Sequence, residues 1–181
     1  SSVQRVIDEV VKKKLDLSTV EPVMAACQKV GLPLSAFFVL GLPGETAAEI
    51  KANVDYAIDK YRRYGVYPTF SMANPLPGTE LYDTVVEGNL LSGNTLDAPP
   101  RANTISTDEF DPAYVQAVYD YANRQKAAIT LRRMLTSPKM FSYFLGLGLR
   151  NKWFLKKIML SALKGVSGQI FFRQYGEFAK R

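Results

Sequence analysis

Histidine is absent from this sequence of 181 residues, and cysteine occurs once, at Cys27. Without histidine, the chain cannot contain a Ser-His-Asp triad, a Cys-His pair or the usual zinc sites. A single cysteine also excludes a disulfide framework and any metal site that needs several cysteines from this chain. Cys27 lies among apolar residues of an expected helix, so we interpret it as a small core residue.

Acidic residues are scarce in the last third of the chain. Residues 130–181 hold 1 acidic and 11 basic residues, a net charge of +10, whereas residues 1–129 hold 16 acidic and 12 basic residues, a net charge of −4. The overall charge of +6 therefore comes from the C-terminal third, which predicts a separate basic region there.

A secretory signal is missing as well, because no basic patch followed by an apolar stretch opens the chain. We therefore expect a cytoplasmic protein. The chain begins Ser1-Ser2 without methionine, and its first expected element is a helix with no strand before it. We expect it to be a piece of a longer polypeptide, whose N-terminal part would be its first partner.

What the sequence does contain is a strand-like segment, SAFFVLGLPGET, that ends at two glycines around a proline. Phe37–Leu40 show no alternation of apolar and polar residues, which predicts a strand covered on both faces. Gly41 and Gly44 would let the chain turn where a side chain would block a ligand. Thr46 and Glu49 stand at the spacing of a capping box, so a helix should begin there with free N–H groups directed at the same cleft. That helix should end at Gly65.

A second turn from a strand into a helix follows one strand–helix unit later, and we call both of these turns corners. The expected strand Val66–Ala73 ends in NPLPGT, and another helix should begin at Thr79. Ser18 and Glu21 have capping-box spacing too, and Gly31 would end the helix that they open. Helices and strands that alternate in this way predict an α/β fold with parallel strands, whose ligands bind at the edge where the strands end.

The organisation of the chain changes after residue 88. Residues 89–107 are rich in Pro, Asn, Ser and Thr and predict a linker. Asp111 with Pro112 then predicts a helix start, and no strand pattern returns. We expect an α/β part over residues 1–88, a linker over 89–107 and a basic, all-helical extension over 108–181.

The two corners resemble the fifth and sixth strand regions of radical S-adenosylmethionine (SAM) enzymes. The resemblance covers residues 36–83, from AFFVLGLPGET to NPLPGTELYD, and reaches back to Ser1. It implies the C-terminal part of a partial TIM-like (β/α)6 barrel followed by the helical extension. The corner with its long helical tail is most similar to the radical SAM proteins that carry a cobalamin-binding domain.

The resemblance also implies cofactors. In that family a [4Fe–4S] cluster, held by three cysteines spaced CxxxCxxC, reduces SAM to a 5′-deoxyadenosyl radical. Those cysteines are absent here, so the cluster ligands would lie outside this chain, in the N-terminal part of the same polypeptide. Cobalamin is implied for the subgroup, and its domain would precede the barrel.

Six residues are carried over from the family to positions of this sequence. Val39 and Gly41 match the strand end that contacts the adenine, and Asn74, Pro75 and Leu76 match the corner of the next strand. Lys14 lies where the family often has a basic residue for the SAM carboxylate. For the corner residues the alternative is an ordinary strand-ending turn, and for Lys14 it is a solvated helix end.

The basic tail has three interpretations. The uncharged run Met140–Leu149 is followed by apolar residues at helical spacing, from Trp153 to Leu163. Opposite them lie mainly lysines, at Lys152, Lys156, Lys157 and Lys164. The first interpretation, which we favour, is a set of helices packed on the barrel. The second is a peripheral contact with an anionic membrane surface. Nucleic-acid binding ranks third, because no recognised module accompanies the charge.

We therefore expect part of a radical SAM enzyme that acts on a small-molecule or lipid-like substrate and supplies the adenine side of the SAM site. The chain alone should not catalyse, since it lacks the cluster cysteines. One alternative is a fragment similar to the radical SAM methylthiotransferases. The other is a non-catalytic α/β module whose corners bind a nucleotide and whose tail docks on a partner or a membrane.

Overall fold

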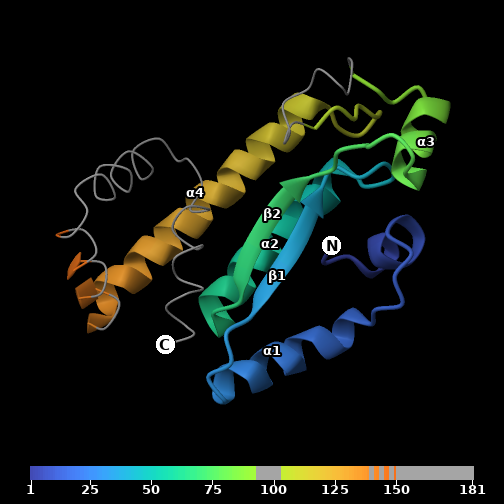
Figure 1. Cartoon of the computed structure of the whole chain (residues 1–181). Coiled ribbons are helices and arrows are strands. Elements are labelled where there is room, and N and C mark those ends of the chain that lie inside the picture. The colour runs from blue at the N-terminus through green and yellow to red at the C-terminus, as the bar shows by residue number, and fades with distance from the viewer. Residues whose placement is uncertain (93–102, 139–140, 143–144, 147–148, 150–181) are drawn as a thin grey trace. The chain divides into compact units, whose positions relative to one another are not determined.

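The computed structural model describes residues 1–92, 103–138, 141–142, 145–146 and 149 (Figure 1). The chain divides into two compact units, Ser1–Tyr119 and Asp120–Arg181. Over the described residues the fold is a mixed α/β arrangement with a two-stranded parallel sheet and several helices. The predicted boundaries at 88 and 107 and the predicted six-stranded barrel remain predictions.

The sheet pairs β1 (Ser35–Leu40) with β2 (Tyr67–Met72) in parallel, with Ser35 opposite Tyr67 and Leu40 opposite Met72. The helix α2 (Ala47–Tyr64) connects the two strands and lies behind the sheet in Figure 1. This confirms the predicted parallel pairing through a helical crossover. The core of the first unit lies between the sheet and α2 and includes Phe38, Leu40, Ile50, Val54, Ile58, Tyr61 and Phe70.

One prediction about β1 is wrong. The apolar run was expected to be covered on both faces, but Phe38 and Leu40 are buried while Phe37 is 78% exposed and Val39 is 37% exposed. Every residue from Phe37 to Leu40 is apolar, so the sequence hides an alternation that the packing imposes. One face of β1 packs on α2, and the other is open over the described part of the chain.

The N-terminal segment is helical, as predicted, but it is divided into short pieces. It forms η1, a single π-helical turn over Val6–Val10, then η2, a 3-10 turn over Leu17–Thr19, and finally α1 (Val20–Lys29). The predicted capping box of Ser18 and Glu21 is wrong, because Asp16 accepts the capping bond from the Ser18 N–H at 2.9 Å. Gly31 follows α1 with φ +73°, in agreement with its predicted place after the helix end.

The other predicted helix ends are confirmed. Thr46 and Glu49 form the capping box of α2, and Gly65 ends that helix in a left-handed conformation. Thr79 caps α3 (Glu80–Glu87) by accepting from the Tyr82 N–H at 3.2 Å. Gly88 follows α3 as its C-cap.

The segment after α3 also packs within the first unit. Leu91 and Ile105 form an isolated antiparallel bridge, and the Ile105 side chain is fully buried. Asp111 then accepts from the Tyr114 N–H at 2.7 Å and opens α4 (Pro112–Thr136), as Asp111-Pro112 predicts. The described part of the predicted linker is therefore packed against its own unit.

The second unit, considered by itself, begins within α4 and is helical at its described residues up to Leu149, except at Ser137. No helix among the described residues is both long enough and apolar enough to cross a membrane. The three interpretations of the tail concern Met140–Lys164, and most of that segment, including Trp153 and the four lysines, lies outside the described residues.

Candidate functional site at the strand ends

The loop that follows β1 is held together by the carboxylate of Glu45. Its Oε2 accepts from the backbone N–H of Gly41 at 3.0 Å and of Leu42 at 2.9 Å. Glu45 is 1% exposed, and this burial raises the pKa of its carboxyl group, against the opposite effect of the two N–H bonds. Its Oε1 is buried without a hydrogen-bond partner among the described residues. Glu45 therefore has a structural role in the loop, and it leaves one unused acceptor there.

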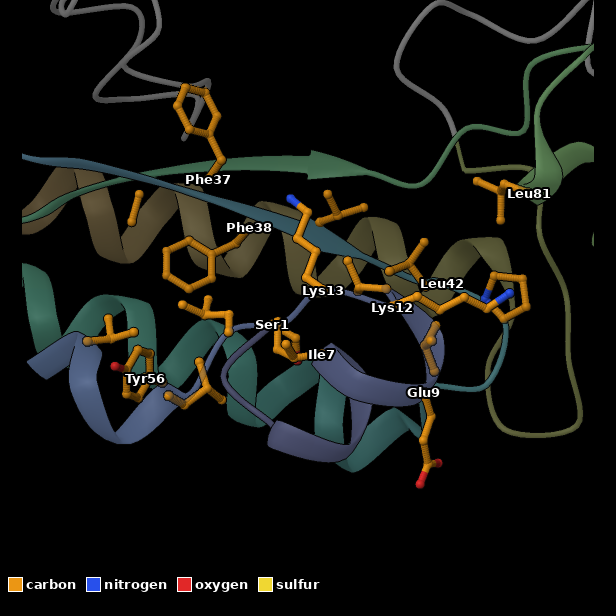
Figure 2. Close-up of a pocket in the computed structure, with 18 of the residues that line it drawn as sticks. Ser1, Ile7, Glu9, Lys12, Lys13, Phe37, Phe38, Leu42, Tyr56 and Leu81 are labelled. Atoms are coloured by element: carbon orange, nitrogen blue, oxygen red, sulfur yellow. The ribbon is translucent and has the colours of Figure 1, made fainter.

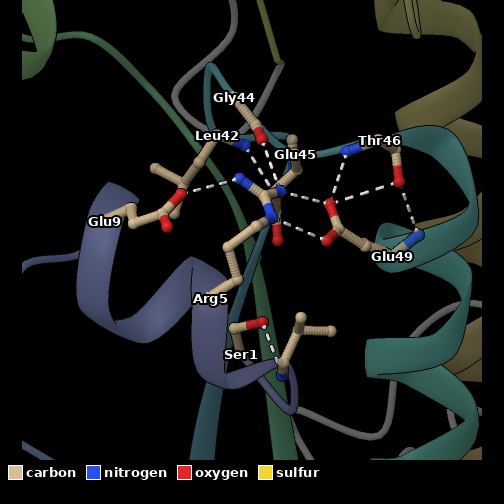
Figure 3. A network of polar contacts seen from close by, with 10 residues as sticks. Ser1, Arg5, Glu9, Leu42, Gly44, Glu45, Thr46 and Glu49 are labelled. Carbon is tan, nitrogen blue, oxygen red and sulfur yellow. Dashed lines mark hydrogen bonds and ion pairs between the residues drawn. The ribbon is translucent and has the colours of Figure 1, made fainter.

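The beginning of α2 is tied to the N-terminal segment through Arg5 (Figure 3). Arg5 donates to both carboxylate oxygens of Glu49, at 3.2 and 2.6 Å, and to the Gly44 carbonyl at 2.8 Å. Glu49 Oε2 also accepts from the Thr46 N–H at 2.9 Å. Among these contacts, the bond from Arg5 has the largest effect in lowering the pKa of Glu49. The N–H groups that were expected to stay free for a ligand are thus partly used by the capping box.

Close packing of the chain on itself explains why residue 41 is a glycine. Its φ is +79°, and a Cβ placed there would lie 2.5 Å from Asn103 Nδ2 and 2.9 Å from Val115 Cγ2. The Gly41 carbonyl accepts from Asn103 Nδ2 at 3.3 Å. Because its N–H is already bound by Glu45, Gly41 can meet a ligand chiefly through its Cα hydrogens. The glycine at position 41, which we expected for the sake of a ligand, is therefore also required by packing within the chain.

The corner after β2 combines a buried polar atom with an exposed apolar side chain. Asn74 Oδ1 is buried and makes no hydrogen bond within the described residues. Pro75 is fully buried, whereas Leu76 is 57% exposed. Thr79 closes the corner with a bond from its hydroxyl to the Leu76 carbonyl at 2.7 Å. The turn thus carries a covered acceptor at Asn74 and an exposed apolar surface at Leu76.

Several buried acceptors without a partner belong to the strand ends. They are Glu45 Oε1 after β1, Asn74 Oδ1 after β2, Asn53 Oδ1 on α2 and Thr104 Oγ1 next to Asn103. Asn53 also donates to the Val39 carbonyl at 3.3 Å, which places it behind the end of β1. Buried polar groups are normally paired, so each of these atoms has the capacity to accept one hydrogen bond more than the described residues supply. Val39 and Leu76 are the exposed apolar side chains at the two strand ends.

Lys14 is exposed and does not line the pocket shown in Figure 2, whereas its neighbours Lys12 and Lys13 do. Lys12 forms an ion pair with Glu80 at the start of α3. The pocket, of about 680 Å³, also takes in Val39 from the predicted site. Gly41, Asn74, Pro75 and Leu76 do not line it. The structure thus brings Val39 to the pocket, leaves Gly41 and Asn74–Leu76 at the strand ends, and places Lys14 between η1 and η2.

Sequence reasoning missed Asn53 and Asn103. Asn53 had a readable signal, because it is a polar residue on the apolar stripe of α2, between Ile50 and Val54. Asn103 had none, because its contact with Gly41 spans 62 positions of a chain segment without periodicity. As for metals, the described residues contain no cluster of three side chains that could hold an ion. With one cysteine, the chain also cannot itself hold a three-cysteine cluster.

Comparisons with known proteins point to methyl transfer. The chain is 32% identical over 87 residues to cytidylyl-2-hydroxyethylphosphonate methyltransferase of Streptomyces wedmorensis, a match over 45% of this chain and 16% of that protein. It is 29% identical over 136 residues to the uncharacterized methyltransferase PH0819 of Pyrococcus horikoshii, over 71% of this chain and 28% of that protein. No protein-family model matches, and no solved structure matches significantly. These distant similarities suggest an enzyme with a function related to methyl transfer.

The chain spans less than a third of the length of either of these methyltransferases. Most of each protein therefore has no counterpart in the residues described above.

Proposed function

We propose that this chain forms the adenine side of the SAM site in a methyl-transferring enzyme of the radical SAM type. The observation that carries the proposal is the pair of corners after β1 and β2, GLPGET and NPLPGT, in a chain distantly similar to two methyltransferases. The buried acceptors without a partner at these corners suit the amino group of an adenine.

In this proposal each residue has a limited task. Val39 and Leu76 cover the faces of the adenine, Asn74 Oδ1 accepts from its amino group, and Pro75 fixes the turn that carries both. Gly41 shapes the end of β1 and contacts the base only through its Cα. Lys14 remains the proposed partner of the SAM carboxylate.

With electrons from a [4Fe–4S] cluster, bound SAM would supply a 5′-deoxyadenosyl radical that acts on a small-molecule or lipid-like substrate. With cobalamin, intact SAM would instead serve as the source of the methyl group that the substrate receives. The N-terminal part of the enzyme would hold the cluster through its own cysteines. Residues of this chain would bind and orient the adenosyl group at the strand ends. A peripheral membrane contact of the tail remains a proposal that depends on residues beyond the described ones.

The test uses two leucines of equal exposure in the full-length enzyme. Leu76 is 57% exposed at the proposed site, and Leu32 is 56% exposed before β1, at the opposite end of the strand. Leu76→Ala should weaken SAM binding about fivefold, because covering the exposed half of a leucine is worth about 1 kcal/mol. Leu32→Ala should leave the dissociation constant unchanged. Titration calorimetry with SAM measures both.

Equal dissociation constants for the two variants and the unmodified enzyme would overturn the assignment of Leu76 to the adenine. If the unmodified full-length enzyme bound no SAM, the proposed function itself would fail. That outcome would favour the alternative of a non-catalytic α/β module.

A further inference from the structure

The end of β1 is held by side chains from three other segments of the first unit. Glu45, in the loop before α2, accepts from the Gly41 N–H at 3.0 Å. Asn53, on α2, donates to the Val39 carbonyl at 3.3 Å. Asn103, which follows α3 in the chain, donates to the Gly41 carbonyl at 3.3 Å. Both backbone polar groups of Gly41 are therefore bound by side chains that come from different segments.

The orientation of the Asn103 carboxamide is assigned by its two partners. Its Oδ1 accepts from the Ile105 N–H at 2.7 Å, so its Nδ2 is the group that faces the Gly41 carbonyl. A flipped amide would bring donor against donor at Ile105 and acceptor against acceptor at Gly41, and both bonds would be lost. Asn103 is only 6% exposed, so water does not readily replace either bond.

The segment that carries Asn103 is itself anchored. Leu91 and Ile105 form an antiparallel bridge, with backbone bonds on either side of it at 2.7 and 2.8 Å. The side chain of Ile105 is fully buried. Because the Ile105 N–H also binds the Asn103 amide, that amide is fixed to a part of the fold that cannot follow small movements of β1.

Gly41 needs such an anchor because glycine does not hold its own conformation. Its φ of +79° is only one of several values that glycine adopts at little cost. A Cβ on residue 41 would lie 2.5 Å from Asn103 Nδ2, so the amide packs against the Gly41 Cα in addition to binding its carbonyl. Asn103 thus both blocks one side of Gly41 and orients its peptide group.

We propose that Asn103 is a positioning residue of the SAM site, which selects the conformation of Gly41 in which the end of β1 presents Val39 to the adenine. This assignment rests on the proposed function. Asn103 acts through Gly41 and does not itself contact SAM. Without its bond, Gly41 regains its freedom, and the apparent dissociation constant of SAM rises by the reciprocal of the fraction that remains competent to bind.

Asn103→Asp in the full-length enzyme tests the proposal, because aspartate keeps the shape of asparagine and can donate to the Gly41 carbonyl only when it is protonated. At pH 8 the ionised variant should bind SAM about tenfold more weakly than the unmodified enzyme, which is the scale of one buried hydrogen bond. At pH 5.5 this ratio should fall to about twofold or less, since burial favours the protonated carboxyl group. Asn103→Ala, which has no donor at any pH, should bind about tenfold more weakly at both pH values.

Titration calorimetry with SAM measures these constants. Each variant is compared with the unmodified enzyme at the same pH, so the titrations of SAM and of the neighbouring Glu45 cancel in the ratio. Gln28→Glu is the matched control, because Gln28 Nε2 also donates to a backbone carbonyl, that of Arg63, at 2.9 Å. Arg63 lies near the end of α2, far from the strand ends, so this variant should bind SAM like the unmodified enzyme at both pH values.

Thermal unfolding of the same variants separates positioning from a structural role. If the Asn103 variants had lowered unfolding midpoints but bound SAM as tightly as the unmodified enzyme, the proposal would be overturned. A ratio for Asn103→Asp that was the same at pH 5.5 and pH 8 would overturn it too, because the donated bond would then not matter. If Asn103→Asp did not fold, unchanged binding by Asn103→Ala would still decide against the proposal. If the unmodified enzyme bound no SAM, the proposed function would fail and this assignment with it, so the two failures are distinguishable.

Discussion

Replacing Gly41 by alanine tests whether the end of β1 is shaped by packing within the chain. The φ of +79° costs alanine about 1–2 kcal/mol. The new Cβ would meet Asn103 Nδ2 at 2.5 Å and Val115 Cγ2 at 2.9 Å, and overpacking of this kind costs about 1–3 kcal/mol. Moving Asn103 away would also lose its bond to the Gly41 carbonyl, worth about 1 kcal/mol. Together these contributions predict a loss of about 3–6 kcal/mol in the free energy of unfolding.

Gly78→Ala is the matched control. Gly78 has φ +83°, but a Cβ there would have no atom within 4 Å. It should therefore cost only the backbone term of about 1–2 kcal/mol. Urea unfolding of both variants, followed by circular dichroism, separates backbone strain from close packing. The reasoning is refuted if Gly41→Ala is no more destabilising than Gly78→Ala.

A double-mutant cycle identifies the neighbour responsible. Trimming Val115 to alanine removes both methyl groups that approach the Gly41 Cβ position. Gly41→Ala should then cost about 1 kcal/mol less in the Val115→Ala background than in the unmodified chain. Additive effects would mean that Val115 does not crowd this position. Because the substitution acts on the fold, a weakened SAM affinity in a Gly41 variant would not by itself place the adenine there.

Two further predictions follow from buried charges. Burial raises the pKa of Glu45, so its ionisation should destabilise the fold as the pH rises from the ordinary carboxyl range through the raised pKa. Glu45→Gln should lack this pH-dependent loss of stability. Urea unfolding of both proteins from pH 4 to pH 8 should therefore show a difference in unfolding free energy that changes with pH. A difference that stayed constant would contradict the prediction. Glu21→Ala leaves the buried Lys60 with Asp59 as its remaining acid and should cost about 2 kcal/mol of unfolding free energy, whereas Lys60→Met should cost less. Thermal unfolding compares the two variants. If Lys60→Met lost as much stability as Glu21→Ala or more, the cost of Glu21→Ala would not come from leaving the buried Lys60 charge with too few acidic partners.

The parts of the fold that the sequence predicts correctly depend on local chemistry. The capping box of Thr46 with Glu49, the left-handed glycine at Gly65 and the start of α4 at Asp111 each involve residues within three or four positions. The parallel pairing of β1 and β2 follows from the helix between them. These features are readable because one short segment contains all the partners.

The parts that the sequence misses depend on partners far along the chain. The Ser18–Glu21 spacing suggested a capping box, but Asp16 caps the turn and Glu21 bonds Lys60, 39 positions away. The exposed face of β1 is as apolar as its buried face, so no pattern distinguishes them. At the candidate site, the sequence resemblance selects the corner residues, whereas only the structure shows Asn53 and Asn103 behind them.

The chemistry of the first corner bears on the choice between an adenine and a phosphate group. A glycine-rich corner before a helix usually binds phosphate through free backbone N–H groups. Here Glu45 takes the N–H groups of Gly41 and Leu42, and the capping box takes those of Thr46 and Glu49. A buried carboxylate with an unused oxygen would also repel an anion. What remains at the strand ends is a set of acceptors beside apolar side chains, which favours a neutral aromatic base with an amino group and argues against a phosphate-binding nucleotide module.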